Sequence, residues 1–140
     1  MTIKLDHINL TTSNLTDSIE WYGKVFGFEL VESGTTPEGI RWGIVAFSDS
    51  MICMTEYGGR VPADRAEDKS VHQIYHFGIR VSDIEKWQQT IRDQKLKLYY
   101  GGQIEYSSSK SWYVHDPSGH EIEVSFAAQG RLHFRSRGVQ

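Results

Sequence analysis

Four side chains able to bind metals or move protons stand in runs where polar and apolar residues alternate. His7 lies in LDHINL, His76 in IYHFGIRV, and Glu121 and Glu123 in HEIEVSF. Successive residues of a β-strand point to opposite faces, so the apolar neighbours of each side chain face a core while the side chain itself faces away. If all the apolar faces pack against helices, His7, His76 and Glu123 line one common surface.

Two imidazoles and a carboxylate on one surface form a candidate metal triad. Neutral histidine and carboxylate together suit Zn, Mn, Ni, Co or Fe(II), and three protein ligands leave positions open for water or substrate. The alternative is structural: His7 lies at a sheet edge, and Glu121 and Glu123 are solvated. Two histidines this far apart are no motif by themselves, so the residues alone leave both interpretations open.

The elements that position these side chains occur twice in the same order. In the first half a strand precedes a helix that Asn14 caps and Gly27 ends, and in the second half Ser82 caps the helix with Glu85 at the capping-box position. Three strand-like runs follow each helix. These runs are FELVES, RWGIVAF and MICMTEY, and then LKLYYGG, SKSWYVH and HEIEVSF.

This repeat predicts an α+β fold of two tandem βαβββ modules that form a curved mixed sheet with a concave metal and substrate cavity. The chain of 140 residues fits a single domain spanning 1–130. We expect module one at about 3–57, a polar linker at 58–72, module two at about 73–126 and a basic C-terminal tail at 131–140.

The composition favours a small-molecule partner. A net charge of −3 provides no basic surface for nucleic acid, and no apolar run is long enough to cross a membrane. A single cysteine, Cys53, rules out an internal disulfide and a zinc site of several cysteines. The opening MTIKLDH has no apolar signal region, so we expect a cytoplasmic protein.

Several short motifs together resemble the vicinal oxygen chelate superfamily, which includes glyoxalase I, bleomycin-resistance proteins, extradiol dioxygenases and fosfomycin-resistance enzymes. They are LDHINL, WYGKVFGFEL, YHFGIRVSD and YVHDPSGHEIEV, and they extend from about Leu5 to Phe126. The resemblance implies that His7, His76 and Glu123 hold one divalent metal ion. It also implies a homodimer, with modules paired within one chain or across two.

The resemblance implies Lewis-acid catalysis on a small oxygen-chelating substrate, in a reaction of the lyase, isomerase or thiol-transfer type. The alternatives are an Fe(II) extradiol-type dioxygenase and a metal-free protein that binds a drug or metabolite. The chain departs from each branch. A Cys at position 53 replaces the fourth ligand of glyoxalase I, and the dioxygenase histidine is missing near Ile104. Asn9 and Gln103 stand where the thiol-transferring enzymes have Thr and Lys.

Other residues are candidates for proton transfer and substrate binding. Tyr113, Glu121 and Glu56 are the nearest proton-transfer candidates, although Glu56 would need a β-bulge to point inward. The positions of Ser107, Ser111 and Tyr113 resemble those of the thiol-transferring enzymes. Strand parity places Asn9 and Arg80 on the concave side of the sheet, where they could contact substrate, but they are equally suited to hydrogen bonds within the sheet. Tyr113 is equally suited to filling the concavity of the sheet.

Overall fold

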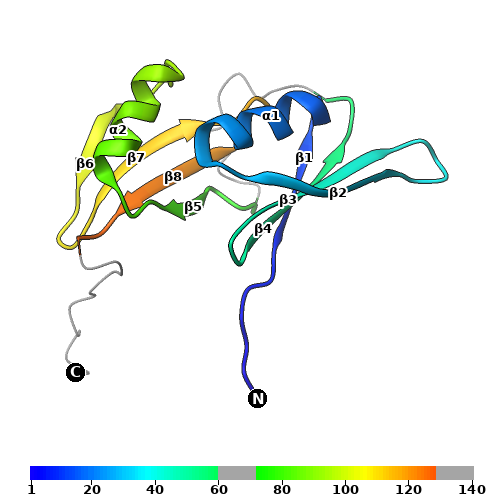
Figure 1. Ribbon diagram of the computed structural model, residues 1–140, viewed down its shortest axis with the longest axis horizontal. Helices are drawn as coiled ribbons and strands as arrows, with labels where there is room; N and C mark the ends of the chain where they lie inside the picture. The colour runs from blue at the N-terminus through cyan, green and yellow to red at the C-terminus, as the bar shows by residue number, and fades with distance from the viewer. Residues whose placement is uncertain (60–71, 129–140) are drawn as a thin grey trace. The chain divides into compact units, whose positions relative to one another are not determined.

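The computed structural model describes residues 1–59 and 72–128. Most of the expected linker and the whole basic tail lie outside the described residues. The chain divides into two compact units, Met1–His72 with Asp116–His120, and Gln73–His115 with Glu121–Gln140. Each unit is described by itself below (Figure 1).

The first unit contains one helix and a four-stranded sheet of order β1-β4-β3-β2. β1 runs parallel to β4, whereas β3 is antiparallel to both of its neighbours. The first strand begins at Ile8 rather than at Leu5. The elements are β1 (Ile8–Thr12), α1 (Leu15–Phe26), β2 (Glu29–Thr35), β3 (Arg41–Phe47) and β4 (Ser50–Glu56).

Helix α1 begins and ends where the sequence predicts. The Asn14 side chain accepts a hydrogen bond from the Asp17 backbone N–H, and Gly27 ends the helix in the left-handed conformation with φ 77°. The helix lies close over β3, because a Cβ on Gly43 would stand 3.3 Å from Ile19 Cδ1. The core of this unit is apolar and consists of Leu15, Tyr22, Val25, Phe28, Val45, Ile52 and Met54.

The second unit repeats this order with a sheet of order β5-β8-β7-β6. β5 runs parallel to β8, and β7 is antiparallel to β8 and β6. The prediction that Ser82 caps the helix is wrong. Asp83 is the N-cap, and its carboxylate accepts from the Lys86 backbone N–H at 3.0 Å. The elements are β5 (Phe77–Arg80), α2 (Ile84–Asp93), β6 (Tyr99–Glu105), β7 (Lys110–His115) and β8 (Glu121–Phe126).

The two faces of the second sheet differ in character. Trp87 of α2 packs against Trp112 with ring centroids 6.4 Å apart, and Val114, Ile122 and Val124 are buried on the same face. Because side chains alternate along each strand, the opposite face carries the polar side chains of β7 and β8. They are Ser111, Tyr113, His115, Glu121 and Glu123.

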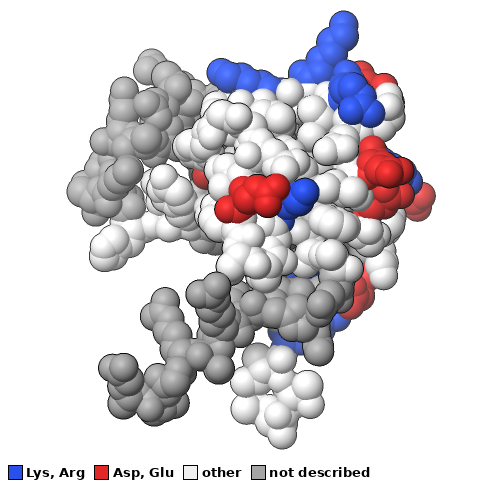
Figure 2. Space-filling model, turned by 90° about the vertical axis from the view of Figure 1, so that its left-hand side faces the viewer, with Lys and Arg blue, Asp and Glu red and all other residues white. Residues whose placement is uncertain are grey.

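The predicted α+β fold of two βαβββ modules is therefore confirmed, with the strands divided between two mixed sheets. Among the described residues, neither helix is long and apolar enough to cross a membrane. Figure 2 shows one side of the molecule, where acidic and basic side chains form small, separate groups on a largely uncharged surface.

Candidate functional site

The second unit brings His76 and Glu123 together as the sequence predicts. His76 Nε2 lies 3.0 Å from Glu123 Oε2. His76 directly precedes β5, and the next residue but one, Gly78, pairs with Glu123 in the parallel ladder. Both side chains are partly exposed, by 30% and 24%, so small molecules can reach the pair.

Ser111 fixes the orientation of the Glu123 carboxylate. Its hydroxyl donates to Glu123 Oε1 at 2.7 Å, which leaves Oε2 directed toward the imidazole. The Ser111 residue is fully buried, with 0% exposure. This position does not support the expected substrate contact of Ser111, because the side chain is covered and its hydroxyl donates to the carboxylate.

Glu121, one of the expected proton-transfer candidates, is almost completely enclosed by neighbouring side chains. It is only 4% exposed and accepts a hydrogen bond from the Tyr100 hydroxyl at 2.5 Å. His115 Nε2 lies 3.3 Å from Glu121 Oε1, and His76 Nδ1 lies 3.9 Å from Glu121 Oε2. The buried Nδ1 atom of His76 has no hydrogen-bond partner among the described residues, and the Glu121 carboxylate approaches it only to the 3.9 Å of an ion pair.

Tyr113 lies beside the pair and points its hydroxyl toward a second phenol. Its ring meets the His76 ring edge-on, with centroids 5.6 Å apart, and its hydroxyl lies 3.0 Å from that of Tyr106. Burial, followed by the hydrogen bond with Tyr106 and the negative charge of Glu123, raises the pKa of Tyr113. The phenol therefore stays protonated at neutral pH and is a hydrogen-bond donor rather than a base.

In the first unit, His7 and Asn9 belong to the uncovered side of the sheet. His7 directly precedes β1, is exposed, and has Nδ1 2.7 Å from Asp6 Oδ2. Asn9 is exposed and accepts a hydrogen bond from the Thr55 hydroxyl at 3.2 Å. Cys53 pairs with Asn9 in the ladder, and burial together with the charge of Asp6 raises the pKa of its thiol. Cys53 therefore remains a neutral thiol at pH 7.

Glu56 points to the helix-covered side of the first sheet. The β1–β4 and β3–β4 ladders contain no bulge, so Glu56 keeps the parity of the buried Ile52 and Met54. Its carboxylate accepts from the Leu15 backbone N–H at 2.7 Å and lies 3.3 Å from Arg41. Glu56 thus satisfies an unpaired N–H group at the start of α1, and this position does not support its expected role in proton transfer.

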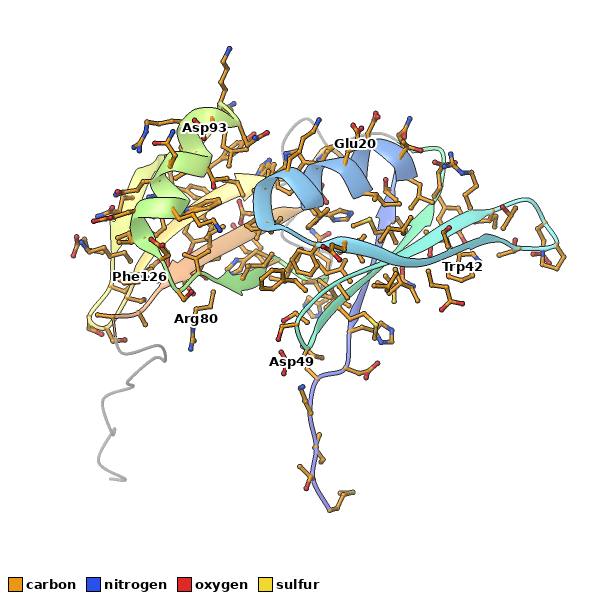
Figure 3. All side chains as sticks on the ribbon, in the orientation of Figure 1. Glu20, Trp42, Asp49, Arg80, Asp93 and Phe126 are labelled. Atoms are coloured by element: carbon orange, nitrogen blue, oxygen red, sulfur yellow. The ribbon has the colours of Figure 1, made fainter. Side chains whose placement is uncertain are left out.

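The two remaining predicted substrate contacts lie at the ends of strands in the second unit. Arg80 is the exposed last residue of β5, and Figure 3 shows its side chain directed away from α2. Ser107 is exposed in the connection between β6 and β7. Neither residue contacts His76 or Glu123 in the described hydrogen bonds and ion pairs.

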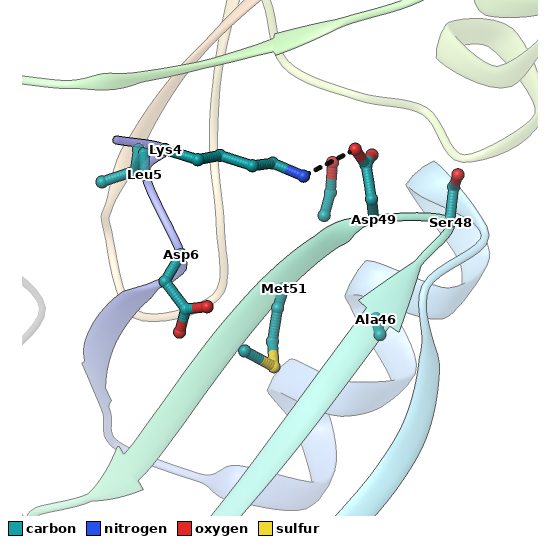
Figure 4. Close-up of a pocket in the computed structure, with 8 residues that line it drawn as sticks. Lys4, Leu5, Asp6, Ala46, Ser48, Asp49 and Met51 are labelled. Carbon is teal, nitrogen blue, oxygen red and sulfur yellow. Dashed lines mark hydrogen bonds and ion pairs between the residues drawn. The ribbon is translucent and has the colours of Figure 1, made fainter. Parts of the chain in front are cut away.

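A cavity of about 210 Å³ in the first unit contains none of the predicted site residues. It lies between the segment preceding β1 and the β3–β4 connection (Figure 4). Lys4 Nζ and Asp49 Oδ2 form an ion pair of 2.9 Å beside it. Both partners of this pair are well exposed, so it contributes little to stability.

The His76–Glu123 pair is suited to a divalent metal. Bonds of about 2.1 Å at angles of about 90–110° would place two ligand atoms about 3.0–3.4 Å apart, which includes the observed separation. The Ser111 hydroxyl on Glu123 is the kind of outer contact that orients a carboxylate ligand. Within neither unit do the described residues gather three His, Cys, Asp or Glu side chains in an arrangement that could hold a metal.

Sequence reasoning missed Tyr100, Tyr106 and His115 as neighbours of this pair. Tyr106 directly precedes Ser107, one of the expected site residues. His115 lies in β7, and strand parity places it on the same face as Ser111 and Tyr113. Tyr100 had no comparable signal, because its position depends on an irregularity in β6. The two glycines that follow it, Gly101 and Gly102, were the available sign of that irregularity.

Comparison with known proteins agrees with this fold. The chain is 25% identical over 120 residues to a metallothiol transferase FosB of Staphylococcus epidermidis, covering 86% of this chain and 79% of the relative. A glyoxylase/bleomycin resistance protein/dioxygenase domain from Frankia sp. EAN1pec has the same fold, with a TM-score of 0.74 and 14% sequence identity. The match covers 94% of this chain and 96% of the Frankia domain.

The fosfomycin resistance protein FosX of Listeria monocytogenes, solved with Mn(II) and sulfate, also has this fold. The comparison gives a TM-score of 0.67 at 16% sequence identity, and the match covers 91% of this chain and 94% of the FosX chain. The sequence model of one family matches residues 4–124, which is most of the chain. The protein therefore belongs to the Glyoxalase/Bleomycin resistance protein/Dioxygenase superfamily.

Proposed function

We propose that this protein is a divalent-metal enzyme in which His76 and Glu123 are metal ligands. The single observation that carries the proposal is the 3.0 Å approach of His76 Nε2 to Glu123 Oε2, with Ser111 holding the other carboxylate oxygen. The family resemblance supplies His7 as the third ligand, from this chain or from a second copy in a homodimer. We leave the metal open among Zn, Mn, Ni, Co and Fe(II).

The reaction that we propose is addition of a small thiol to an electrophilic carbon of an oxygen-bearing substrate such as an epoxide. The new bond joins sulfur to carbon, a carbon–oxygen bond breaks, and the proton of the thiol ends on the released oxygen. A bound divalent ion supplies Lewis-acid stabilisation of that oxygen. Support for this class comes from the FosB relative, whose name describes metal-dependent thiol transfer.

The residues of the second unit have defined roles in this proposal. Ser111 orients Glu123, and the protonated phenol of Tyr113 is a hydrogen-bond donor beside the site. Glu121 is enclosed by Tyr100, His115 and His76. We therefore assign it the role of positioning the His76 imidazole, because its carboxylate is poorly placed to meet a substrate. Asn9, Arg80 and Ser107 stay candidates for contact with substrate.

Metal content tests the proposal directly. We expect protein purified without chelator to hold about one divalent ion per chain by mass spectrometry of the elements. His76→Ala and Glu123→Gln should lose the metal, whereas the control His72→Ala, an exposed histidine that directly precedes the second unit, should keep it. Unchanged metal content in His76→Ala would show that the pair is not a metal site.

The same preparations separate the alternative functions. Wild-type protein without metal that still binds a drug or metabolite would indicate a binding protein. Oxygen consumption with a catechol and iron, measured with an oxygen electrode, would indicate a dioxygenase. Loss of free thiol in the presence of an epoxide, abolished in Glu123→Gln, is the result expected for thiol transfer.

A further inference from the structure

Asp6 and His7, two consecutive residues of the first unit, form a direct side-chain contact just before β1. His7 Nδ1 lies 2.7 Å from Asp6 Oδ2. In a regular strand, consecutive side chains point to opposite faces and would not meet. β1 begins only at Ile8, so this alternation does not yet apply to the two residues that precede it. The contact is therefore a feature of the segment before the strand, and strand parity does not predict it.

The Asp6 carboxylate is committed to this histidine. In the part of the chain that the structure describes, His7 is the only ion-pair partner of Asp6. The neighbouring cation, Lys4, pairs instead with Asp49 at 2.9 Å. Figure 4 shows the Asp6 side chain directed away from that pair. No lysine or arginine among the described ion pairs therefore competes with the imidazole for this carboxylate.

The contact decides which nitrogen of the neutral imidazole is protonated. An ionised carboxylate only accepts hydrogen bonds, so the proton lies on Nδ1 and the lone pair of Nε2 is free. In the described hydrogen bonds Nε2 of His7 has no partner, and the side chain is 43% exposed. Histidines that bind metals usually donate their other ring N–H to a carboxylate, a backbone carbonyl or water. His7 already has this arrangement.

The histidine of the second unit has a similar arrangement. His76 directs Nε2 toward Glu123 at 3.0 Å, and its Nδ1 lies 3.9 Å from Glu121 Oε2. Each unit thus places a carboxylate on the Nδ1 side of its imidazole. Only the first unit closes this contact to a full hydrogen bond, because 2.7 Å is typical of a charge-assisted bond whereas 3.9 Å is too long.

We propose that Asp6 is a positioning residue that holds the His7 imidazole with its proton on Nδ1, so that Nε2 is the atom offered to a divalent metal. The inference rests on the proposed function for the metal itself, whereas the effect of Asp6 on the imidazole exists in the metal-free protein. Without the carboxylate the ring is free to rotate and to carry its proton on Nε2. A protonated nitrogen cannot bind a metal, so the affinity falls.

The tautomer of His7 tests the first part of the proposal. Nitrogen-15 NMR of the imidazoles measures it in metal-free, full-length protein at about pH 8, where histidine is neutral. The signals that disappear in His7→Ala identify the residue. We expect His7 to be protonated mainly on Nδ1 in the wild type and mainly on Nε2 in Asp6→Ala. The matched control is Asp49→Ala, which removes another exposed carboxylate beside the same cavity and should keep the wild-type tautomer.

The affinity for Zn(II), measured by competition with a chromophoric chelator, tests the second part. Asp6→Ala should bind Zn(II) about tenfold more weakly, at the lower end of the usual range because both side chains are exposed, and Asp49→Ala should bind it like the wild type. An unchanged tautomer or an unchanged affinity in Asp6→Ala would overturn the proposal. A loss of metal as complete as in His76→Ala would also overturn it, because Asp6 would then be a ligand. Wild-type protein that binds no metal, with a tautomer that still depends on Asp6, would remove the proposed function and keep the control of His7 by Asp6.

Discussion

Ser111 and Glu123 are joined diagonally across β7 and β8. Ser111 pairs with Ser125 in the ladder, yet its hydroxyl donates to Glu123 Oε1 at 2.7 Å, two residues back along β8. The donor is fully buried, so the hydrogen bond is protected from water. A carboxylate held in this way has one oxygen committed to the protein and one directed toward His76.

Ser111→Ala should weaken metal binding without removing it. Loss of the hydrogen bond frees the Glu123 carboxylate to rotate, and outer contacts of this type typically change metal affinity about 10–100-fold. Competition with a chromophoric chelator measures the affinity. Ser107→Ala, an exposed serine between β6 and β7, is the control and should retain wild-type affinity. An unchanged affinity in Ser111→Ala would mean that Glu123 does not depend on this contact.

Glu56→Gln should affect stability and leave metal binding intact. The Glu56 carboxylate accepts the Leu15 N–H and pairs with Arg41, so removing its charge weakens the start of α1. We expect the free energy of unfolding in urea to fall by about 0.5–2 kcal/mol. Metal content equal to wild type would agree with this role, whereas loss of metal with unchanged stability would restore Glu56 to the site.

Paired substitutions distinguish the two candidate caps of α2. Asp83→Ala should destabilise the protein by about 0.5–2 kcal/mol, because the Lys86 N–H loses its acceptor and the helix N-terminus loses a negative charge. Ser82→Ala should have a much smaller effect, since Ser82 is exposed outside the helix. Chemical denaturation of both variants provides the comparison, and a larger loss in Ser82→Ala would contradict the observed cap.

Because of the buried Tyr22 phenol, the free energy of unfolding should fall at alkaline pH. Its buried hydroxyl donates to Asp116 at 2.9 Å, and burial together with the Asp116 charge raises the pKa of Tyr22. Above pH ~10 the unfolded state loses this proton while the folded state keeps it, so the free energy of unfolding falls as the pH rises. Below that pH the contribution is fully present.

Tyr22→Phe should therefore flatten the alkaline decline and lower stability at pH 7 by about 1–3 kcal/mol, because Asp116 loses a buried donor. Urea unfolding between pH 7 and 11 measures both effects. Tyr57→Phe, which changes an exposed tyrosine, should keep the wild-type pH dependence. An alkaline slope in Tyr22→Phe identical to wild type would show that this phenol does not govern it.

Much of the fold could be predicted because the local signals were strong. Asn14 and Gly27 bound α1 as predicted, since capping and left-handed turns depend on a few neighbouring residues. The alternation in HEIEVSF also identified the buried Ile122 and Val124. The cap of α2 was assigned one residue early, because Ser82 and Asp83 are both good capping residues and the sequence does not rank them.

The sequence by itself determined the two βαβββ modules and the shared face of His76 and Glu123, because strand parity fixes which side chains lie on the same side of a sheet. Only the tertiary structure decided what surrounds that pair. The Ser111 hydroxyl supports Glu123 through a diagonal hydrogen bond, and this contact depends on the pairing register of β7 and β8. Tyr100 joined the same face through a bulge, and a bulge breaks the alternation on which prediction from sequence depends.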